Sequence, residues 1–458
     1  MIEAPLNPPA RAAEARGTRR WSFAFGPRFP YILLAGFVWV GPAWFDSRYL
    51  AALVAWDAAA FVAWWLDLRR IPEPGALVVT RSFEDALALE SDVRVRIEVA
   101  NKGGRAITAR LLDEVPVALR GAPPELTFDV AAGSRAMAGY AIRPQRRGNT
   151  SFGMAWLRYV STMGLAERWA VAPIEQTIRV YPNLETSRRL TLYLTRGRQA
   201  GHERLHKRQR GAGREFESLR EYRDGDQWRD VCWTATARRG RLISRVYRIE
   251  RDQVVWIVVD AGRLLQASAG SLTKLDHAAS AALGVAQVAL HSGDRVGLLT
   301  YGRRVQQRVP PASGAGHLRL LLEALTDVRS ERSEADHLGA ARALLQVQKR
   351  RALVIWLTDL ADTATTPDVV QGAMQIGSQH LVIFVAIGQT TLWTAAEDAP
   401  KDARAMYRYV AALEVLERRQ LLLGNLRRGG AWIADVQAGS LAVAMVNQYL
   451  QIKERGLL

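Results

Sequence analysis

Residues 253–260, QVVWIVVD, and residues 351–359, RALVIWLTD, decide how this chain folds. Each stretch is apolar over most of its length and ends in an aspartate. Strands of a parallel sheet are covered on both faces, so they read as continuous rather than alternating apolar runs. The two stretches therefore predict two buried parallel strands, each with an acidic residue at its carboxyl end.

The residues around these two strands alternate between strand and helix patterns. Further strands are predicted at 294–302, 380–388 and 429–437, and an antiparallel edge strand at 304–309. Helical patterns lie around 275–291, 318–325, 338–348 and 440–453. Such alternation implies right-handed crossovers. Residues 253–458 are thus predicted to form a doubly wound α/β sheet with helices on both faces.

Asp260 and Asp359 lie at the two strand ends, where open α/β sheets bind ligands. Two carboxylates projecting into one crevice are suited to Mg²⁺, a hard cation that prefers oxygen ligands. Acidic residues at strand ends also serve as helix caps and as loop hydrogen-bond acceptors. The sequence alone leaves both interpretations open.

This arrangement resembles the von Willebrand factor A fold, whose metal-ion-dependent adhesion site carries Asp-x-Ser-x-Ser after the first strand. Here the sequence is Asp260-Ala261-Gly262-Arg263-Leu264, so both hydroxyl ligands are missing and an arginine is added. The loop 330–336 has no threonine to match the family's middle-loop ligand, and Ser333 or Asp336 would have to replace it. We therefore expect a degenerate metal site, with Asp260 forming a salt bridge to Arg263 or another arginine instead.

A longer motif lies just upstream of the first strand. Residues 213–226 read GREFESLREYRDGD, and residues 229–238 read RDVCWTATAR. These resemble the signature of the domain-of-unknown-function-fifty-eight family, G-x-E-F-x-x-L-R-x-Y-x-x-G-D followed by R-x-I-x-W-x-x-x-A-R, with Val231 in place of isoleucine. The resemblance implies a bacterial membrane protein with an A-like domain and a MoxR-type AAA ATPase as partner.

The signature contains no Ser/His/Asp catalytic arrangement. Its arginines, Arg220, Arg229 and Arg238, are expected either to pair with neighbouring acids or to form a partner surface. Its aromatic residues are expected to anchor the segment on the sheet domain as a structural collar. His202 and His206 lie outside the signature among basic residues, and they do not have the zinc-protease spacing.

Two apolar runs, 31–45 and 49–66, precede these domains. The second has the length that a membrane helix needs, whereas the first is marginal. Arginines flank the pair on both outer sides and only Arg48 lies in the turn, which predicts that both ends face the cytoplasm. A buried hairpin in a soluble protein and a cleaved signal peptide are the alternatives.

The predicted organisation has five parts: a flexible basic tail (1–28), a two-helix transmembrane hairpin (29–70), a small β-sandwich (71–182), a basic signature segment (183–252) and the A-like domain (253–458). The β-sandwich rests on period-two stretches at 76–83, 92–100, 126–133 and 136–144. The expected location is the inner (cytoplasmic) membrane, with the soluble domains facing the cytoplasm. The single cysteine, Cys232, excludes an internal disulfide framework.

Charge widens the choice of partners. The chain has 62 Lys+Arg and 45 Asp+Glu, a net charge of +17, and residues 184–251 alone hold 18 basic and 9 acidic residues. We expect a membrane-anchored, non-enzymatic adaptor that docks a partner at Asp260, Arg263 and Asp359, and Asp359→Ala is expected to weaken docking without unfolding. The alternatives are an anionic lipid or nucleic-acid binding module, with lipid favoured and no specific nucleic acid expected, and a Mg²⁺-dependent enzyme. No other cofactor is expected.

Overall fold

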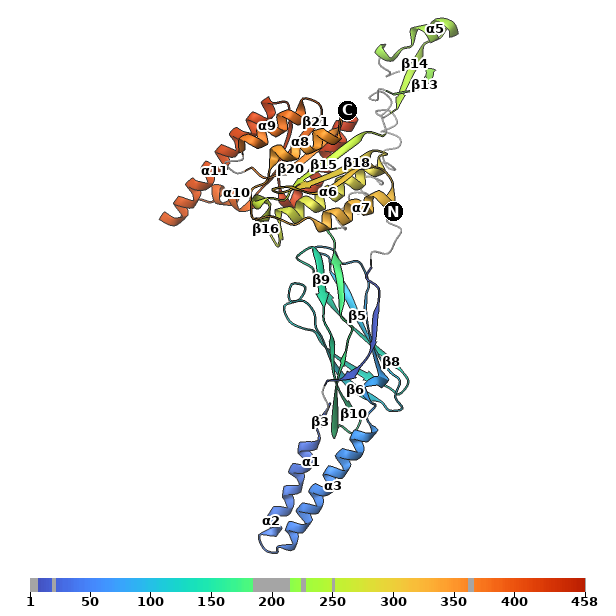
Figure 1. The fold of residues 1–458 in the computed structure, drawn as a ribbon, viewed down its shortest axis with the longest axis vertical. Helices are drawn as coiled ribbons and strands as arrows, with labels where there is room; N and C mark the ends of the chain where they lie inside the picture. Colours follow the sequence, from blue (N-terminus) through green and yellow to red (C-terminus); the bar gives the residue numbers. More distant parts are fainter. Residues whose placement is uncertain are drawn as a thin grey trace. The chain divides into compact units, whose positions relative to one another are not determined.

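The structure, a computed structural model, describes residues 7–18, 22–183, 215–223, 228–248, 252–360 and 366–457. It is a mixed α/β protein with several sheets (Figure 1). The chain divides into two compact units on either side of the Val180–Tyr181 bond.

The first unit contains two antiparallel sheets joined through a buried core. The strands of the first sheet, in spatial order, are β1 (Arg11–Glu14), β4 (Leu77–Phe83), β5 (Val93–Asn101) and β8 (Arg135–Ile142). Those of the second are β2 (Arg16–Gly17), β11 (Ala166–Ala172), β10 (Ala155–Ser161), β6 (Ile107–Asp113) and β7 (Glu125–Val130). A separate pair is β9 (Gly148–Phe152) with β12 (Gln176–Val180). In β4 and β5 buried residues alternate with more exposed ones, as the period-two pattern predicted.

The N-terminal residues differ from the predicted flexible tail. β1 pairs with β4, while β2 and β3 (Phe23–Phe25) both pair with β11. These strands are two to four residues long, too short to show a period in the sequence. They form because β4 and β11 would otherwise present unpaired backbone groups at the sheet edges.

An apolar helical segment lies between β3 and β4. It consists of α1 (Phe29–Gly36), η1 (Phe37–Trp39), α2 (Val40–Ala43) and α3 (Arg48–Arg70), followed by η2 (Pro74–Ala76). Within the part of the chain that the structure describes, α3 is the one helix long and apolar enough to cross a membrane, judged by length and composition, and the stretch Phe29–Ala43 is apolar but shorter.

Helices α1 and α3 lie side by side (Figure 1). Trp56 Nε1 donates a hydrogen bond to the Ile32 carbonyl at 2.9 Å. A Cβ atom at Gly36 would lie 2.6 Å from the Trp56 ring, so this close approach requires glycine. The end of α3 is tied to the second sheet, because the buried carboxylate of Asp67 accepts hydrogen bonds from Ser161 Oγ and from the Leu165 and Ala166 amides, at 2.6–3.0 Å.

In the second unit, the signature residues form a small hairpin motif. β13 (Glu215–Glu221) pairs with β14 (Ile243–Arg248), and between them lie η3 (Trp228–Asp230) and α5 (Trp233–Arg239). This motif precedes the large sheet along the chain.

The large sheet has the topology predicted from the apolar runs. Its strands, in spatial order, are β19 (Val305–Ala312), β18 (Arg295–Tyr301), β15 (Val254–Asp260), β20 (Leu353–Thr358), β21 (Leu381–Gly388) and β22 (Trp432–Gln437). All neighbours are parallel except β19, which runs antiparallel to β18 at the edge, as predicted. The chain starts in the middle at β15 and builds outward in both directions.

Helices cover both faces of this sheet (Figure 1). On one side pack α6 (Lys274–His291), α7 (Ala315–Asp327) and α12 (Leu441–Glu454), the last preceded by η5 (Ala438–Ser440). On the other side pack α8 (His337–Val347), α9 (Thr366–Gly377) and α11 (Ala403–Arg428), with α10 (Thr390–Glu397) against α11. The sequence did not predict α10 or α11. Only four residues of α11 are buried, so its apolar pattern is weak.

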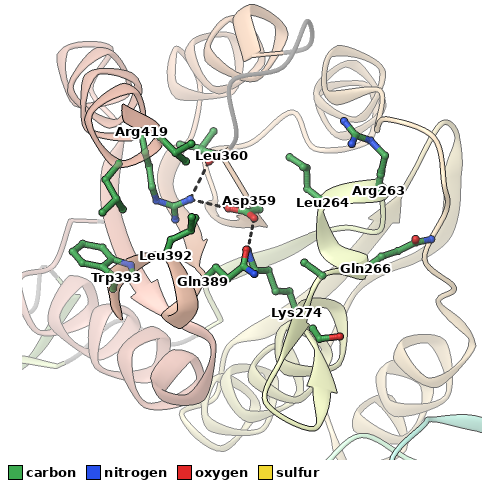
Figure 2. A pocket seen from close by; sticks show the side chains of 14 residues that line it. Arg263, Leu264, Gln266, Lys274, Asp359, Leu360, Gln389, Leu392, Trp393 and Arg419 are labelled. Atoms are coloured by element: carbon green, nitrogen blue, oxygen red, sulfur yellow. Dashed lines mark hydrogen bonds and ion pairs between the residues drawn. The ribbon is translucent and has the colours of Figure 1, made fainter. Parts of the chain in front are cut away.

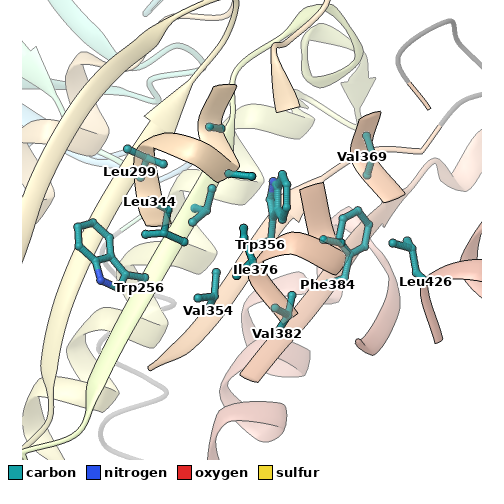
Figure 3. Close-up of a cluster of buried hydrophobic side chains, with 14 of the residues drawn as sticks. Trp256, Leu299, Leu344, Val354, Trp356, Val369, Ile376, Val382, Phe384 and Leu426 are labelled. Carbon is teal, nitrogen blue, oxygen red and sulfur yellow. The ribbon is translucent and has the colours of Figure 1, made fainter. Parts of the chain in front are cut away.

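The core on the α8–α9 face is built around aromatic residues (Figure 3). Trp256 donates a hydrogen bond to Gln348, at 3.0 Å. Trp356 donates one to the Tyr301 hydroxyl at 2.7 Å, and that hydroxyl lies 2.9 Å from His337 Nδ1. Each buried ring therefore has a partner for its polar atom, which avoids the cost of an unpaired buried group.

Candidate functional site: a strand-end crevice

Asp260 and Asp359 lie at the same edge of the large sheet. β15 ends at Asp260, and its parallel neighbour β20 ends at Thr358, one residue before Asp359. The Thr358 hydroxyl donates a hydrogen bond of 2.6 Å to Asp260 Oδ2. The structure thus brings both predicted carboxylates into one region.

Asp260 forms the floor of this region. It is 2% exposed, and its Oδ1 accepts a hydrogen bond from the Gly262 amide at 2.7 Å. Burial raises the pKa of Asp260 to about 6, although the bonds from Thr358 and Gly262 oppose the rise. The expected salt bridge with Arg263 is wrong, because Arg263 points away and pairs with Glu334 at 3.1 Å. Asp260 is instead held by a loop amide and a hydroxyl, the loop hydrogen-bonding alternative.

Asp359 has two cationic partners (Figure 2). Lys274 Nζ lies 2.6 Å from Oδ2, and Arg419 Nη1 lies 2.7 Å from Oδ1. Arg419 also donates to the Leu360 carbonyl at 3.0 Å and to Asp435 at 2.9 Å. All four charged side chains are at least four-fifths buried. The cluster Lys274–Asp359–Arg419–Asp435, below called the crevice cluster, is therefore a charge-balanced network.

Local sequence explains where the two cations lie. After η4 (Arg263–Gln266) a small hairpin, β16 (Ser268–Ala269) and β17 (Leu272–Thr273), leads into α6. Thr273 and Asp276 form a capping box that starts this helix, so Lys274 occupies its first position at the sheet edge. Arg419 belongs to the buried stripe of α11, together with Ala412, Leu423 and Leu426.

A pocket of about 480 Å³ opens beside the crevice cluster (Figure 2). One part of its lining is polar or charged and the other part is apolar. The polar residues include Arg263, Gln266, Lys274, Asp359, Gln389 and Arg419, and the apolar ones Leu264, Leu360, Leu392, Trp393, Val415 and Leu416. Asp260 lies beneath this surface and does not line the pocket.

The donors present do not fit the divalent cation that the A-like resemblance implies. Gly262 and Leu264 supply no side-chain oxygen, and the loop candidates are engaged elsewhere: Ser333 donates to Glu331, and Asp336 caps α8. The Lys274 ammonium lies on the carboxylate that would bind the metal. Across the described ranges, no group of three or more His, Cys, Asp or Glu is placed to hold a metal ion. A buried cation already supplies the positive charge at this position.

The signature residues do not join the crevice residues as one described surface. Arg220 donates to the Glu221 carbonyl at 2.9 Å, while the Glu221 carboxylate pairs with Arg241. Arg238 is exposed in the last turn of α5. The side chain of Arg229, together with His202 and His206, lies outside the described residues.

Two of the signature's aromatic side chains are not buried as the collar interpretation expected. Trp228 and Trp233 are 63% and 61% exposed. Trp228 contacts Tyr222, with ring centroids 5.4 Å apart. These tryptophans therefore remain open to contact a partner, which the collar interpretation did not foresee.

Sequence reasoning missed Lys274, Arg419 and Trp393. A buried acid at a strand end is often paired with a cation, as Asp359 is, and that tendency was a usable signal. It did not single out a residue, because the chain holds 62 lysines and arginines. Trp393 lies in α10, which had no predicted helix pattern.

Fold and site together define a two-unit protein with a strand-end crevice bordered by buried ion pairs and, among the described residues, one candidate membrane helix. Residues 218–391 match the family described as "Protein of unknown function DUF58". The resemblance predicted from the signature is therefore confirmed over these residues.

Relatives of the chain include the uncharacterized proteins Rv1480 of Mycobacterium tuberculosis and Mb1516 of Mycobacterium bovis. Each is 27% identical over 151 residues, which cover 32% of this chain and 48% of the relative. The chain thus spans about half the length of these relatives.

Two solved structures show a weak likeness. The conserved hypothetical protein BatB from Bacteroides thetaiotaomicron is 14% identical, with a TM-score of 0.28, covering 44% of this chain and 98% of that one. A PapD-like domain of human CEP192 is 9% identical, with a TM-score of 0.16, covering 21% of this chain and 77% of that one. Likenesses at these TM-scores say nothing about function.

Proposed function

We propose that this protein is a membrane-anchored, non-enzymatic adaptor whose A-like domain docks a MoxR-type AAA ATPase at the strand-end crevice. The family resemblance supports the choice of partner. Helix α3 would supply the anchor as half of a transmembrane hairpin, with the remaining domains in the cytoplasm of a bacterial cell.

The observation that carries this proposal is the state of Lys274. Its side chain is 3% exposed, yet it lines the pocket. An ammonium group has three hydrogens to donate, and the described residues supply one acceptor, Asp359. A carboxylate from a partner would satisfy the remaining donors, and the docked partner would displace the water of the pocket, which strengthens the pairing. The crevice therefore suits an acidic side chain without any metal ion.

The apolar lining of the pocket supplies the rest of a docking site. Leu392 and Trp393 lie next to the charged residues (Figure 2). Leu416 also lines the pocket. A tryptophan in a pocket rimmed by charges is typical of the residues that dominate binding energy at interfaces. Exposed apolar side chains of α11, including Tyr407 and Val410, extend the candidate surface along that helix.

Co-purification tests the proposal. The full-length protein, tagged at its C-terminus, would be solubilised from native membranes in mild detergent, with and without ATP. We expect an AAA ATPase whose recovery depends on nucleotide. Trp393→Ala should lower that recovery at least tenfold, as loss of a central aromatic contact does.

Leu320→Ala is the matched control, because Leu320 is exposed on α7 and does not line the pocket. It should leave recovery unchanged. If no ATPase is recovered under either condition, the partner is wrong. If Trp393→Ala and Leu320→Ala recover the ATPase equally, the ATPase is the partner but it does not dock at the crevice.

The basic segment 184–251 supports a second candidate, a module that binds anionic lipid or nucleic acid. Its described part includes exposed Arg238, Arg239 and Arg241 beside Trp228 and Trp233. Binding through phosphate contacts would weaken steeply with rising salt, because each contact releases counterions. A flat salt dependence would remove this candidate.

The Mg²⁺-dependent enzyme is the weakest of the three, because Lys274 and Arg419 already pair with the two oxygens of Asp359. Cleavage activity that needs added Mg²⁺ and disappears in Asp260→Asn would revive it.

A further inference from the structure

A second hollow lies where α3 meets the second sheet of the N-terminal unit. It measures about 900 Å³ and draws its lining from β2, β11 and the last turn of α3. Three arginines line it, Arg16, Arg69 and Arg168, against one acid, Glu73. The hollow therefore has an excess of positive charge.

Among the described residues, the three arginines have N–H donors without a hydrogen-bond partner. Arg168 donates to the Leu68 carbonyl at 3.3 Å, while its Nε is buried and has no hydrogen-bond partner among the described residues. Arg16 is exposed on β2, and Arg69 stacks over the ring of Trp65 with 3.9 Å between its Cζ and the ring centroid. Guanidinium groups with unused N–H donors are suited to phosphate, which accepts two parallel hydrogen bonds.

Aromatic side chains form the rest of the lining. Trp64 is fixed by a hydrogen bond from its Nε1 to the Ala24 carbonyl at 3.3 Å, and Phe23 packs beside it, with ring centroids 6.0 Å apart. Trp65 is 45% exposed. Tryptophans next to arginines at the end of a long apolar helix are typical of the membrane–water interface.

We infer that this hollow binds the headgroup of an anionic phospholipid, with its phosphate between Arg16, Arg69 and Arg168 and its glycerol region against Trp64 and Trp65. The inference rests on the proposed anchoring by α3, which would place the hollow at the cytoplasmic surface, where anionic lipids attract basic residues. Asp67 fixes the last turn of α3 to the sheet. The arginine of the helix therefore keeps a fixed position relative to the arginines of the strands.

Lipid titration followed by native mass spectrometry tests the site. Full-length protein in detergent micelles would receive phosphatidylglycerol, phosphatidylcholine or glycerol 3-phosphate. We expect phosphatidylglycerol to bind at least fivefold more tightly than phosphatidylcholine. Arg16→Gln should weaken phosphatidylglycerol binding about fivefold, the effect of one basic residue near an anionic surface. Phosphatidylcholine binding should not change.

Arg110→Gln is the matched control, an exposed arginine on β6 that does not line the hollow. Arg168→Gln is a stronger but riskier variant because of its bond to Leu68. Equal binding of the two lipids, or no effect of Arg16→Gln, overturns the inference. Glycerol 3-phosphate binding as tightly as the lipid also overturns it, since the site would then serve free phosphate.

Carbonate washing of the membranes separates this inference from the anchoring on which it rests. Protein that stays in the washed membranes but shows no lipid preference means that the headgroup site is wrong and the anchor is right. Protein that washes off means that anchoring is wrong, and the headgroup site falls with it.

Discussion

Each unit of the molecule buries an ion pair, and the two are built differently. Arg81 and Asp113 lie between the two sheets of the N-terminal unit, both fully buried. Arg81 also donates to the Ile174 and Gly153 carbonyls, and the Tyr140 hydroxyl donates to Asp113 at 2.5 Å. In the crevice cluster Asp359 is also buried, but Lys274 faces a pocket and has one side-chain hydrogen bond, to Asp359, among the described residues.

The comparison shows that burial of charge alone does not mark a functional site. The Arg81–Asp113 pair is satisfied from all sides by its own fold, so it serves structure. The crevice cluster is balanced in charge but open to a ligand. Unused hydrogen-bonding capacity next to a cavity is the property that distinguishes the two.

The largest expected effect is on the closed pair. Asp113→Ala leaves Arg81 buried without a counter-charge and removes the acceptor of Tyr140. We expect the free energy of unfolding to fall by about 3–5 kcal/mol, which is the usual cost of breaking a buried pair from one side. Denaturant titration of the purified full chain measures this. A loss below about 1 kcal/mol would show that the site is wetter than the structure indicates.

The open cluster should respond less strongly. Asp359→Ala removes the partner of Lys274, but Arg419 keeps Asp435, and the pocket admits water to Lys274. We expect a loss of about 2–3 kcal/mol in unfolding free energy, less than for Asp113→Ala. Asp359→Ala is thus still expected to leave the domain folded, at a lower stability. Equal losses in the two variants, measured by the same titration, would erase the distinction between a closed and an open site.

Asp260 sharpens the comparison because it is buried and has no ion-pair partner among the described residues. Its pKa of about 6 exceeds that of an unfolded aspartate, so the folded state binds more protons between about pH 4 and 6. Its contribution to stability is present at low pH and is lost as pH rises through 6. His337 acts oppositely: burial lowers its pKa to about 4, so stability rises with pH between about 4 and 6.5.

The two slopes partly cancel in the natural protein. In Asp260→Asn the contribution of His337 remains, so the free energy of unfolding should rise more steeply with pH. In His337→Gln the contribution of Asp260 remains, so the free energy of unfolding should fall with pH. Each change should amount to about 1–3 kcal/mol across that window. Thermal melting of both variants from pH 4.5 to 7 measures the slopes. Slopes that match those of the natural protein would show that neither group is as buried as the structure indicates.

The smallest effect on stability is expected at the rim. Arg263 and Glu334 form an exposed pair, and such pairs contribute about 0–1 kcal/mol. Arg263→Ala should therefore have nearly the melting temperature of the natural protein but a lower recovery of the partner. Arg319 is exposed on α7, and Arg319→Ala should change neither the melting temperature nor the recovery. If Arg263→Ala leaves recovery unchanged, the rim lies outside the docking surface.

Much of the large sheet was predictable, because buried parallel strands such as β15 and β20 can be recognised in the sequence as continuous apolar runs. That Asp260 and Asp359 would share an edge followed from the same pattern. The partners of Asp359 did not follow, because Lys274 and Arg419 lie 85 and 60 positions away in the chain. Strands β1 to β3 also escaped prediction, since edge pairing rather than their own composition creates them.

The central claim is that the crevice docks a partner through the Lys274 ammonium group without a metal ion. The most direct test is the recovery of the AAA ATPase by the double variant Lys274→Met/Asp359→Asn, which removes one positive and one negative charge and leaves Arg419 paired with Asp435. Docking through Lys274 requires that the double variant folds and shows at least tenfold lower recovery, while Leu320→Ala shows the recovery of the natural protein. A folded double variant that recovers the ATPase as well as the natural protein would contradict it.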